Sequence, residues 1–109
     1  MRMWLVDPSI LCRQHLLGDH RECHTMLGVL RRGISIDGYI DGGLYEPARI
    51  ADWHEALVQE MAKRGYNHKS PLVVDIPLPV RGHIDIKGNY EELKRRCPRC
   101  RVKIEAMNE

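Results

Sequence analysis

One face of the first predicted helix carries side chains that could transfer a proton or bind an anion. At about 100° per residue, Gln14, His15 and Glu22 fall on one stripe, with Arg21 at its edge. A carboxylate can act as a general base and an arginine can bind a phosphate. Gly18 lies within the same stripe, and a glycine there destabilises the helix by about 1 kcal/mol relative to alanine. The glycine is either simply tolerated or marks a place that another molecule approaches closely. A solvent-facing helix side with an ion pair or two is the other interpretation of these residues.

A second set of candidate residues is the C-x-x-C sequence formed by Cys97 and Cys100, which has the spacing of half a zinc site. A tetrahedral site needs two more ligands, and only tertiary contacts with other cysteines or the histidines could supply them. Cys12 and Cys23 fall on the apolar face of the first predicted helix, where we expect both to be small buried side chains. The sequence therefore predicts no metal site and no cofactor.

Three helices are predicted to position these residues. The first runs from about residue 8 to 31, with Asp7 as its N-cap, and the second from about 47 to 64, ending at Gly65. A short third helix runs from about 89 to 96. The apolar face of the first helix spans an arc of about 100° and consists of Cys12, Leu16, Cys23, Met26, Leu27 and Leu30.

Long irregular loops are predicted to connect the helices. Residues 33–46 are rich in glycine, and residues 71–80 contain three prolines and must be extended. We expect the two tryptophans to lie in the core. We expect His54 on a helix surface and His68 in a loop, neither as a metal ligand.

Length and composition limit the class of protein. A chain of 109 residues has room for one domain, and 43% apolar with 29% charged residues excludes collagen-like and generic disordered chains. No apolar run approaches the roughly 20 residues that span a bilayer, and the N-terminal sequence lacks the features of a signal peptide. We therefore predict a mainly α, small single domain over residues 1–109, with about three helices joined by long irregular loops, acting in the cytoplasm as a monomer without a membrane partner.

The net charge of +2 is unevenly distributed along the chain. Residues 81–103 carry eight basic and three acidic side chains, whereas residues 33–80 are net acidic. A polyanion is a reasonable partner for such a basic segment. A solvated helix face with a basic tail explains the same charges equally well.

Two stretches of the sequence resemble the phage-type pyrimidine dimer DNA glycosylases, also called endonuclease V of that type. Residues 14–16 (QHL), followed by Arg21, Glu22 and Gly28, resemble the first helix of that family. Residues 63–67 (KRGYN) resemble the end of its second long helix. Together the resemblance covers roughly residues 1–32 and 46–70.

The resemblance implies a DNA repair N-glycosylase with AP-lyase activity that needs no cofactor. The family works with a free N-terminal α-amine followed by an arginine, and here Met1 precedes Arg2 with Glu22 in register. An α-amine has a pKa near 7.7–8.0, so roughly 10–30% of it is the free base at neutral pH. Such an amine can attack C1′ of a deoxyribose and form a Schiff base, and the implied role of Glu22 is that of general base.

The same resemblance implies contacts with damaged double-stranded DNA, most naturally at UV-induced pyrimidine dimers. Arg2, Arg21 and the basic C-terminal stretch suit phosphates, whereas Gln14 and His15 suit the kinked strand or the sugar. Extracting a base costs least at a damaged, poorly stacked step. The protein would then be associated with the nucleoid when it is bound to DNA.

Two departures from the family leave the lesion open and keep other functions under consideration. Thr25 stands where relatives carry an additional arginine, and the C-terminal region lacks their aromatic tail. One alternative is a non-catalytic nucleic-acid-binding module, zinc-stapled through Cys97 and Cys100. Another is a structural or partner-binding helical protein. A binding module would tolerate both Glu22→Gln and acetylation of the N-terminus, and a glycosylase would tolerate neither.

Overall fold

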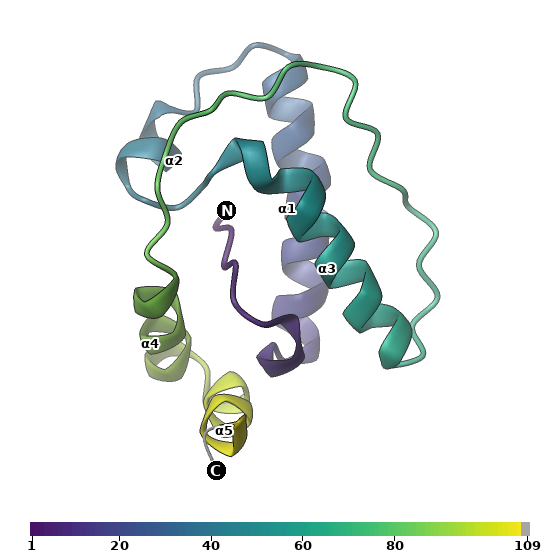
Figure 1. Ribbon diagram of the computed structural model, residues 1–109, viewed down its shortest axis with the longest axis vertical. Coiled ribbons are helices and arrows are strands. Elements are labelled where there is room, and N and C mark those ends of the chain that lie inside the picture. The colour runs from purple at the N-terminus through teal and green to yellow at the C-terminus, as the bar shows by residue number, and fades with distance from the viewer. Residues whose placement is uncertain (108–109) are drawn as a thin grey trace.

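The computed structural model describes residues 1–107, which form helices joined by irregular segments (Figure 1). The helices are α1 (Arg13–Arg31), the short α2 (Asp37–Asp41), α3 (Ile50–Lys63), α4 (Ile86–Arg96) and α5 (Pro98–Met107). Two 3-10 turns, η1 (Pro8–Ile10) and η2 (Pro47–Arg49), precede α1 and α3. The described residues include no strand, so the predicted mainly α fold is confirmed.

The first predicted helix is interrupted near its start. Asp7 caps η1, accepting a hydrogen bond from the backbone N–H of Ser9 at 3.0 Å, but Leu11 and Cys12 are extended and α1 begins only at Arg13. Arg64 accounts for the break, because its guanidinium binds carbonyl oxygens in this turn, among them that of Leu11 at 2.7 Å. The second predicted helix is present as η2 running directly into α3.

The C-terminal part of the chain contains one helix more than predicted. α4 begins at Ile86, where Asp85 accepts a hydrogen bond from the backbone N–H of Gly88 at 3.0 Å. It ends before Pro98 as expected, but Pro98 then occupies the first position of α5. Proline suits the first turn of a helix as well as it ends the preceding one, and only the second role was expected here.

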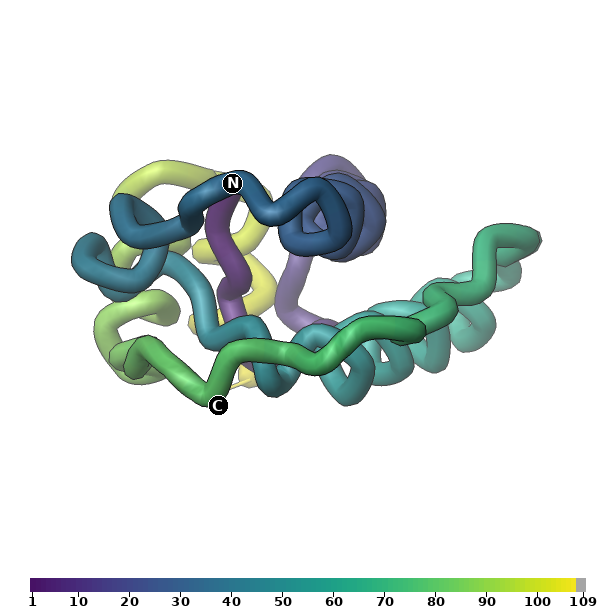
Figure 2. The backbone as a smooth tube through the Cα atoms, turned by 90° about the horizontal axis from the view of Figure 1, so that it is seen from above, coloured from purple at the N-terminus to yellow at the C-terminus, as the bar shows by residue number. Residues whose placement is uncertain are grey.

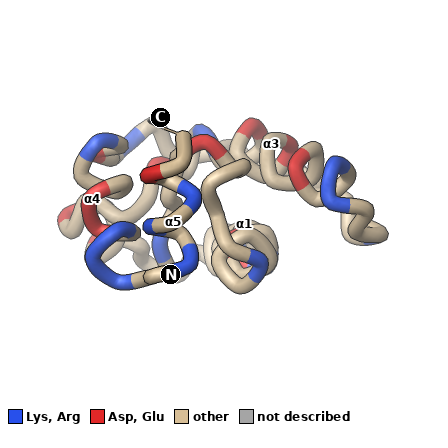
Figure 3. Tube along the Cα trace, turned by 90° about the horizontal axis from the view of Figure 1, so that it is seen from below, with Lys and Arg blue, Asp and Glu red and all other residues tan. Residues whose placement is uncertain are grey.

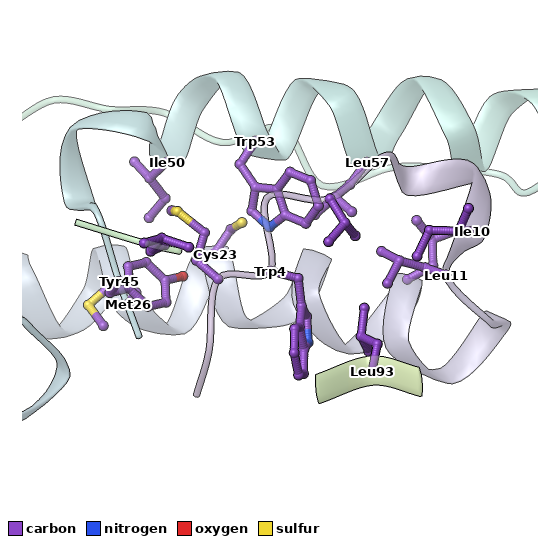
Figure 4. Close-up of a cluster of buried hydrophobic side chains, with 14 of the residues drawn as sticks. Trp4, Ile10, Leu11, Cys23, Met26, Tyr45, Ile50, Trp53, Leu57 and Leu93 are labelled. Atoms are coloured by element: carbon purple, nitrogen blue, oxygen red, sulfur yellow. The ribbon is translucent and has the colours of Figure 1, made fainter. Parts of the chain in front are cut away.

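The N-terminal segment, residues 1–7, runs extended through the middle of the molecule and belongs to its core (Figures 1 and 4). Met3, Trp4 and Val6 are buried, and the backbone N–H of Met3 donates to the carbonyl of Leu44 at 2.9 Å. Leu5 has φ +53°, and this left-handed turn bends the segment between Trp4 and Val6. α1 packs against α3 on one side, and α4 pairs with α5.

Residues 66–85 connect α3 to α4 without regular secondary structure (Figures 1 and 2). Arg31, in the last turn of α1, anchors the segment by donating to Asp75 at 2.8 Å and to the carbonyl of Val73 at 2.5 Å. Alternate side chains along it are half-buried, namely Leu72, Val74, Ile76 and Leu78. The extended conformation predicted for residues 71–80 is therefore present.

Among the described residues, no helix combines the length and the apolar character required to cross a membrane.

Candidate active site at the amino terminus

The N-terminal segment is fixed against α1 by two carboxylates that lie one helical turn apart. The backbone N–H of Arg2 donates to Oε2 of Glu22 at 3.3 Å, and that of Trp4 donates to Oδ2 of Asp19 at 3.2 Å. The amine of Met1 is separated from the Arg2 nitrogen only by the Cα and carbonyl carbon of Met1. It therefore lies within about 7 Å of the Glu22 carboxylate. The chain end and the carboxylate thus come together from positions twenty residues apart.

Asn89 of α4 holds the other side of the N-terminal segment. Its Oδ1 accepts hydrogen bonds from Nη2 and Nε of Arg2 at 2.6 and 3.2 Å, and its Nδ2 donates to the carbonyl of Trp4 at 2.7 Å. The Arg2 guanidinium also lies over the Trp4 ring, 4.5 Å from its centroid. Partial burial and the positive charge of Arg96 lower the pKa of Arg2. The Arg2 guanidinium therefore binds the protein itself, although the sequence suggested a phosphate contact.

Asp19 is a buried acid that was not among the candidate residues expected from sequence. Burial, together with the nearby negative charge of Glu22, raises the pKa of Asp19 to about 8, even though hydrogen bonds from Trp4 and Trp53 act in the opposite direction. The side chain therefore carries a proton through much of the neutral range. The sequence did contain a sign of this buried acid: Asp19 lies within the apolar arc of α1, and an acid at such a position faces the core. No signal in the sequence connected Asn89 to the N-terminus.

The surface of α1 beside Glu22 is open. Gln14 and Arg21 are exposed, as a contact with an external partner requires. Apart from its chain neighbours and the nearby backbone of α1 itself, no heavy atom lies within 4 Å of where a Cβ at Gly18 would sit. Gly18 and Glu22 are four residues apart and so are neighbours on the helix face. This face can therefore accept a flat or kinked ligand next to the Glu22 carboxylate.

His15 points away from that open face. Its Nδ1 lies 3.2 Å from Sγ of Cys12 and 3.5 Å from Sγ of Cys100, and its ring meets the Trp4 ring edge-on. Burial lowers the pKa of His15, with Arg96 acting in the same direction and Glu22 opposing it. Of the four residues predicted to contact DNA, Gln14 and Arg21 are presented outward, whereas Arg2 and His15 face protein groups.

Within residues 1–107, two clusters of side chains have the composition of metal sites. In the first, the ligand atoms of Cys12, His15, Cys97 and Cys100 all lie within 4.8 Å of one another. Tertiary contacts therefore bring two further candidate ligands to Cys97 and Cys100. Cys12 is buried, as expected, but it also belongs to this cluster.

The second cluster consists of histidines between α1 and the α3 side of the molecule. Ligand nitrogens of His20, His54 and His68 lie within 4.8 Å of one another, and the His24 ring packs against both His20 and His54. The expectation of His54 on a helix surface is wrong: it is buried, because α3 turns it toward α1. Burial and the three neighbouring histidines lower the pKa of His20 to about 4. The four-residue spacing of His20 and His24 was a sequence signal that could have indicated this cluster.

A family model described as pyrimidine dimer DNA glycosylase matches residues 1–73. The match includes the N-terminal segment, α1 and α3, whereas α4 and α5 lie outside it. No curated protein and no solved structure matches the chain. The class is therefore that of the DNA glycosylases, as the resemblance of the sequence predicted. The chain belongs to the pyrimidine dimer DNA glycosylase family.

Proposed function

We propose that the protein is a DNA repair N-glycosylase with AP-lyase activity that acts on UV-induced pyrimidine dimers in double-stranded DNA. The α-amine of Met1 is the nucleophile, and Glu22 is the general base. One observation carries the proposal: the 3.3 Å hydrogen bond from the Arg2 backbone N–H to Glu22, which holds the chain end beside that carboxylate. The family match over the same residues supports it.

The chemistry begins with the free-base form of the amine. Its nitrogen bonds to C1′ of the damaged nucleotide as the glycosidic C1′–N bond breaks, and the electron pair leaves with the base, which takes up a proton. Loss of the amine proton and opening of the sugar ring give a Schiff base. Removal of a C2′ proton then expels the 3′ phosphate by β-elimination. Glu22 accepts the protons, and its charge stabilises the cationic sugar.

Binding to DNA would use the open face of α1. Arg21 suits a phosphate, Gln14 suits the sugar or the kinked strand, and the space over Gly18 lets the backbone of the helix come close to the ligand. Arg2 contributes differently from the expectation based on sequence, because its contacts with Asn89 position the segment that carries the amine. Nδ1 of His15 faces the sulfur atoms of Cys12 and Cys100. Any contact of His15 with DNA would therefore use the other edge of its ring.

Trapping of the Schiff base tests the mechanism directly. The untagged protein, with its intact mass recorded, would be mixed with UV-irradiated duplex DNA and borohydride, and the modified residue located by mass spectrometry. We expect a reduced adduct on the Met1 nitrogen, and none after acetylation of the N-terminus. A free, intact N-terminus that forms no adduct would refute dimer repair by this route.

Replacement of the carboxylate tests the role of Glu22. We expect Glu22→Gln to lose nearly all nicking of irradiated DNA while it keeps lesion binding, because the amide cannot accept a proton. The control is Glu55→Gln, at an exposed position on α3, which should retain full nicking. Normal turnover of Glu22→Gln would remove this residue from the mechanism. The non-catalytic binding module predicts no nicking by the unmodified protein in the first place.

A further inference from the structure

We propose that Cys12, His15, Cys97 and Cys100 bind one Zn²⁺ ion in a closed tetrahedral site with three sulfur ligands and one nitrogen. The cluster brings together two short spacings. Cys12 and His15 are three residues apart at the start of α1, and Cys97 and Cys100 are three apart where α4 passes into α5. The spacing of Cys97 and Cys100 is typical of structural zinc sites.

Three of the distances between the ligand atoms are close to those of a zinc tetrahedron, and the remaining pairs lie within 4.8 Å. Zn–S bonds of about 2.3 Å and Zn–N bonds of about 2.0–2.1 Å place ligand sulfurs about 3.8 Å apart and sulfur and nitrogen about 3.6 Å apart. In the protein, Sγ of Cys12 and Cys97 are 3.9 Å apart, and Nδ1 of His15 lies 3.2 and 3.5 Å from two of the sulfurs. A disulfide would need sulfurs about 2.05 Å apart. The four groups therefore surround one point without covalent bonds to one another.

Two backbone N–H groups in the cluster donate to its sulfur atoms. The N–H of Cys12 donates to Sγ of Cys100 at 3.2 Å, and the N–H of Cys100 donates to Sγ of Cys97 at 3.4 Å. Hydrogen bonds of this kind orient metal ligands and offset their negative charge. Three thiolates and one imidazole in a tetrahedron select zinc among the common divalent ions. All four positions are filled by protein, so the ion would be structural and would not activate a water.

The zinc site would connect α1 to the α4–α5 pair, and the catalytic proposal requires these two parts of the chain to be held together. Cys97 and Cys100 lie beyond the residues matched by the family model, whereas Cys12 and His15 lie within them. The ion would thus tie the α4–α5 pair to α1, and α4 carries Asn89, which holds Arg2. Zinc would then act as a positioning element for the N-terminal amine, and this consequence rests on the proposed function.

Metal analysis of the intact protein tests the site without DNA. We expect one zinc per chain after purification from zinc-containing medium and dialysis, and X-ray absorption showing three sulfur ligands at about 2.3 Å and one nitrogen at about 2.0 Å. Replacement by cobalt should give the strong visible absorption of a tetrahedral thiolate site. A zinc-free protein, or a shell of nitrogen and oxygen only, would overturn the proposal. Because these measurements use the unmodified chain, they do not depend on a variant that folds.

Variants assign the ion to this cluster and not to the histidines. Cys97→Ser should lose at least nine-tenths of the bound zinc. Cys23→Ala, at a buried cysteine outside the cluster, and His68→Asn, in the histidine cluster, should each keep one zinc per chain. Zinc retained by Cys97→Ser or lost by His68→Asn would contradict the assignment.

The consequence for catalysis has its own readout. Removal of zinc by a chelator should reduce borohydride trapping on Met1 at least tenfold, and re-addition of zinc should restore it. Glu22→Gln should keep one zinc per chain. Trapping unaffected by zinc removal would refute the positioning role. Zinc present in a protein that never nicks DNA would leave the metal site standing and refute only the catalytic proposal.

Discussion

Glu22 holds the N-terminal segment through a backbone N–H and not through the side chain of residue 2. The hydrogen bond therefore depends on the path of the chain, and that path is set by Asp19 and Asn89 on either side. The charged side chain of Arg2 adds a second anchor. The amine at the end of the segment is thus attached to residues that are themselves fixed.

Because the space over Gly18 is open, a substitution at this position should change stability and activity in opposite directions. In the free protein an alanine fits there without contact, so Gly18→Ala should raise the free energy of unfolding by about 0.5–1 kcal/mol through helix propensity. The added methyl group would occupy the space that we assign to DNA, so nicking of irradiated duplex should fall at least tenfold. Urea unfolding and a nicking assay measure the two effects.

Gly28 provides the matched control for Gly18. It also lies within α1 but off the Glu22 stripe. As at Gly18, no heavy atom other than those of its chain neighbours and the nearby helix backbone lies within 4 Å of where its Cβ would sit. Gly28→Ala should stabilise the protein to the same degree and leave nicking unchanged. Equal activity of the two alanine variants would show that nothing binds over Gly18.

Asp19 should make the stability of the protein depend on pH. Its pKa is about 8 in the folded state and near 3.8 when unfolded, so the folded state binds the proton more tightly. The resulting stabilisation is complete below pH 4 and is lost as the pH rises through 8. Asp19→Asn keeps an oxygen for the N–H groups of Trp4 and Trp53 but cannot ionise.

Urea unfolding across pH 5.5–8 would measure this effect. We expect Asp19→Asn to gain stability relative to the unmodified protein as the pH rises, by up to about 1.4 kcal/mol per pH unit. Parallel pH profiles for the two proteins would contradict a buried, protonated Asp19.

At the scale of elements, Arg64 fixes the turn that leads into α1. Its side chain is only 16% exposed, pairs with Glu60 at 2.8 Å and donates to the carbonyl of Leu11 at 2.7 Å. It is part of the KRGYN sequence on which the family resemblance relied, and its observed role is structural. It joins the end of α3 to the start of α1, next to Cys12 of the proposed zinc site.

Arg64→Met should lower the free energy of unfolding by about 2–4 kcal/mol, because half-buried carbonyls and Glu60 lose a charged donor. Arg49→Met is the control: its ion pair with Glu46 is 53% exposed on the arginine side and should contribute at most about 1 kcal/mol. Urea unfolding compares them. Equal losses would mean that the Arg64 contacts are not maintained in solution.

The helices themselves were predictable from sequence, whereas their ends and their contacts were not. Apolar periodicity identified α1 and α3 because it depends on neighbours along the chain, and Pro98 marked the end of the predicted helix that corresponds to most of α4. The break at Leu11 and Cys12 depends on Arg64, more than fifty residues away, and no local pattern encodes it. α5 was missed because Pro98 has two roles, as the end of one helix and the start of another.

The candidate site also has features that were predictable from sequence and features that were not. Helical periodicity placed Gln14, Arg21 and Glu22 on one accessible stripe, and the structure has all three on α1 with the first two exposed. The partners of this stripe from other parts of the chain were not predictable. Asn89 gives no local sign that it binds Arg2, and the proposed zinc site depends on a fold that brings residues 12 and 97 together.

At the scale of the whole molecule, much of the basic charge near the C-terminus is balanced within its own helices (Figure 3). Lys94 pairs with Glu91 at 3.1 Å, Arg95 and Arg96 both pair with Glu92, and Arg101 approaches Glu105. Because these ion pairs place acidic side chains beside basic ones, the positive electrostatic potential around residues 81–103 is weaker than the number of basic side chains alone suggests. Under the proposed function, we therefore expect the exposed Arg21, beside the open face of α1, to be the more important cation for DNA.

Salt titrations of DNA binding test this distribution of charge. Arg21→Ala should weaken binding to damaged and undamaged duplexes alike and should reduce the slope of log K against log salt by about 1. Arg95→Ala, which removes a base already paired with Glu92, should change the slope by less than half as much. An unchanged slope for Arg21→Ala would deny it a phosphate contact.

Under the proposed mechanism, the position of the N-terminal segment also determines when the molecule could become active during its synthesis. Residues 1–7 are translated well before Asn89, to which Arg2 and Trp4 are hydrogen-bonded. At about 5–20 residues per second, several seconds separate the two events. A nascent chain with α1 and α3 already folded would still lack a fixed amine. Under the proposed mechanism, the reactive amine is therefore synthesised well before Asn89, the residue that fixes its position.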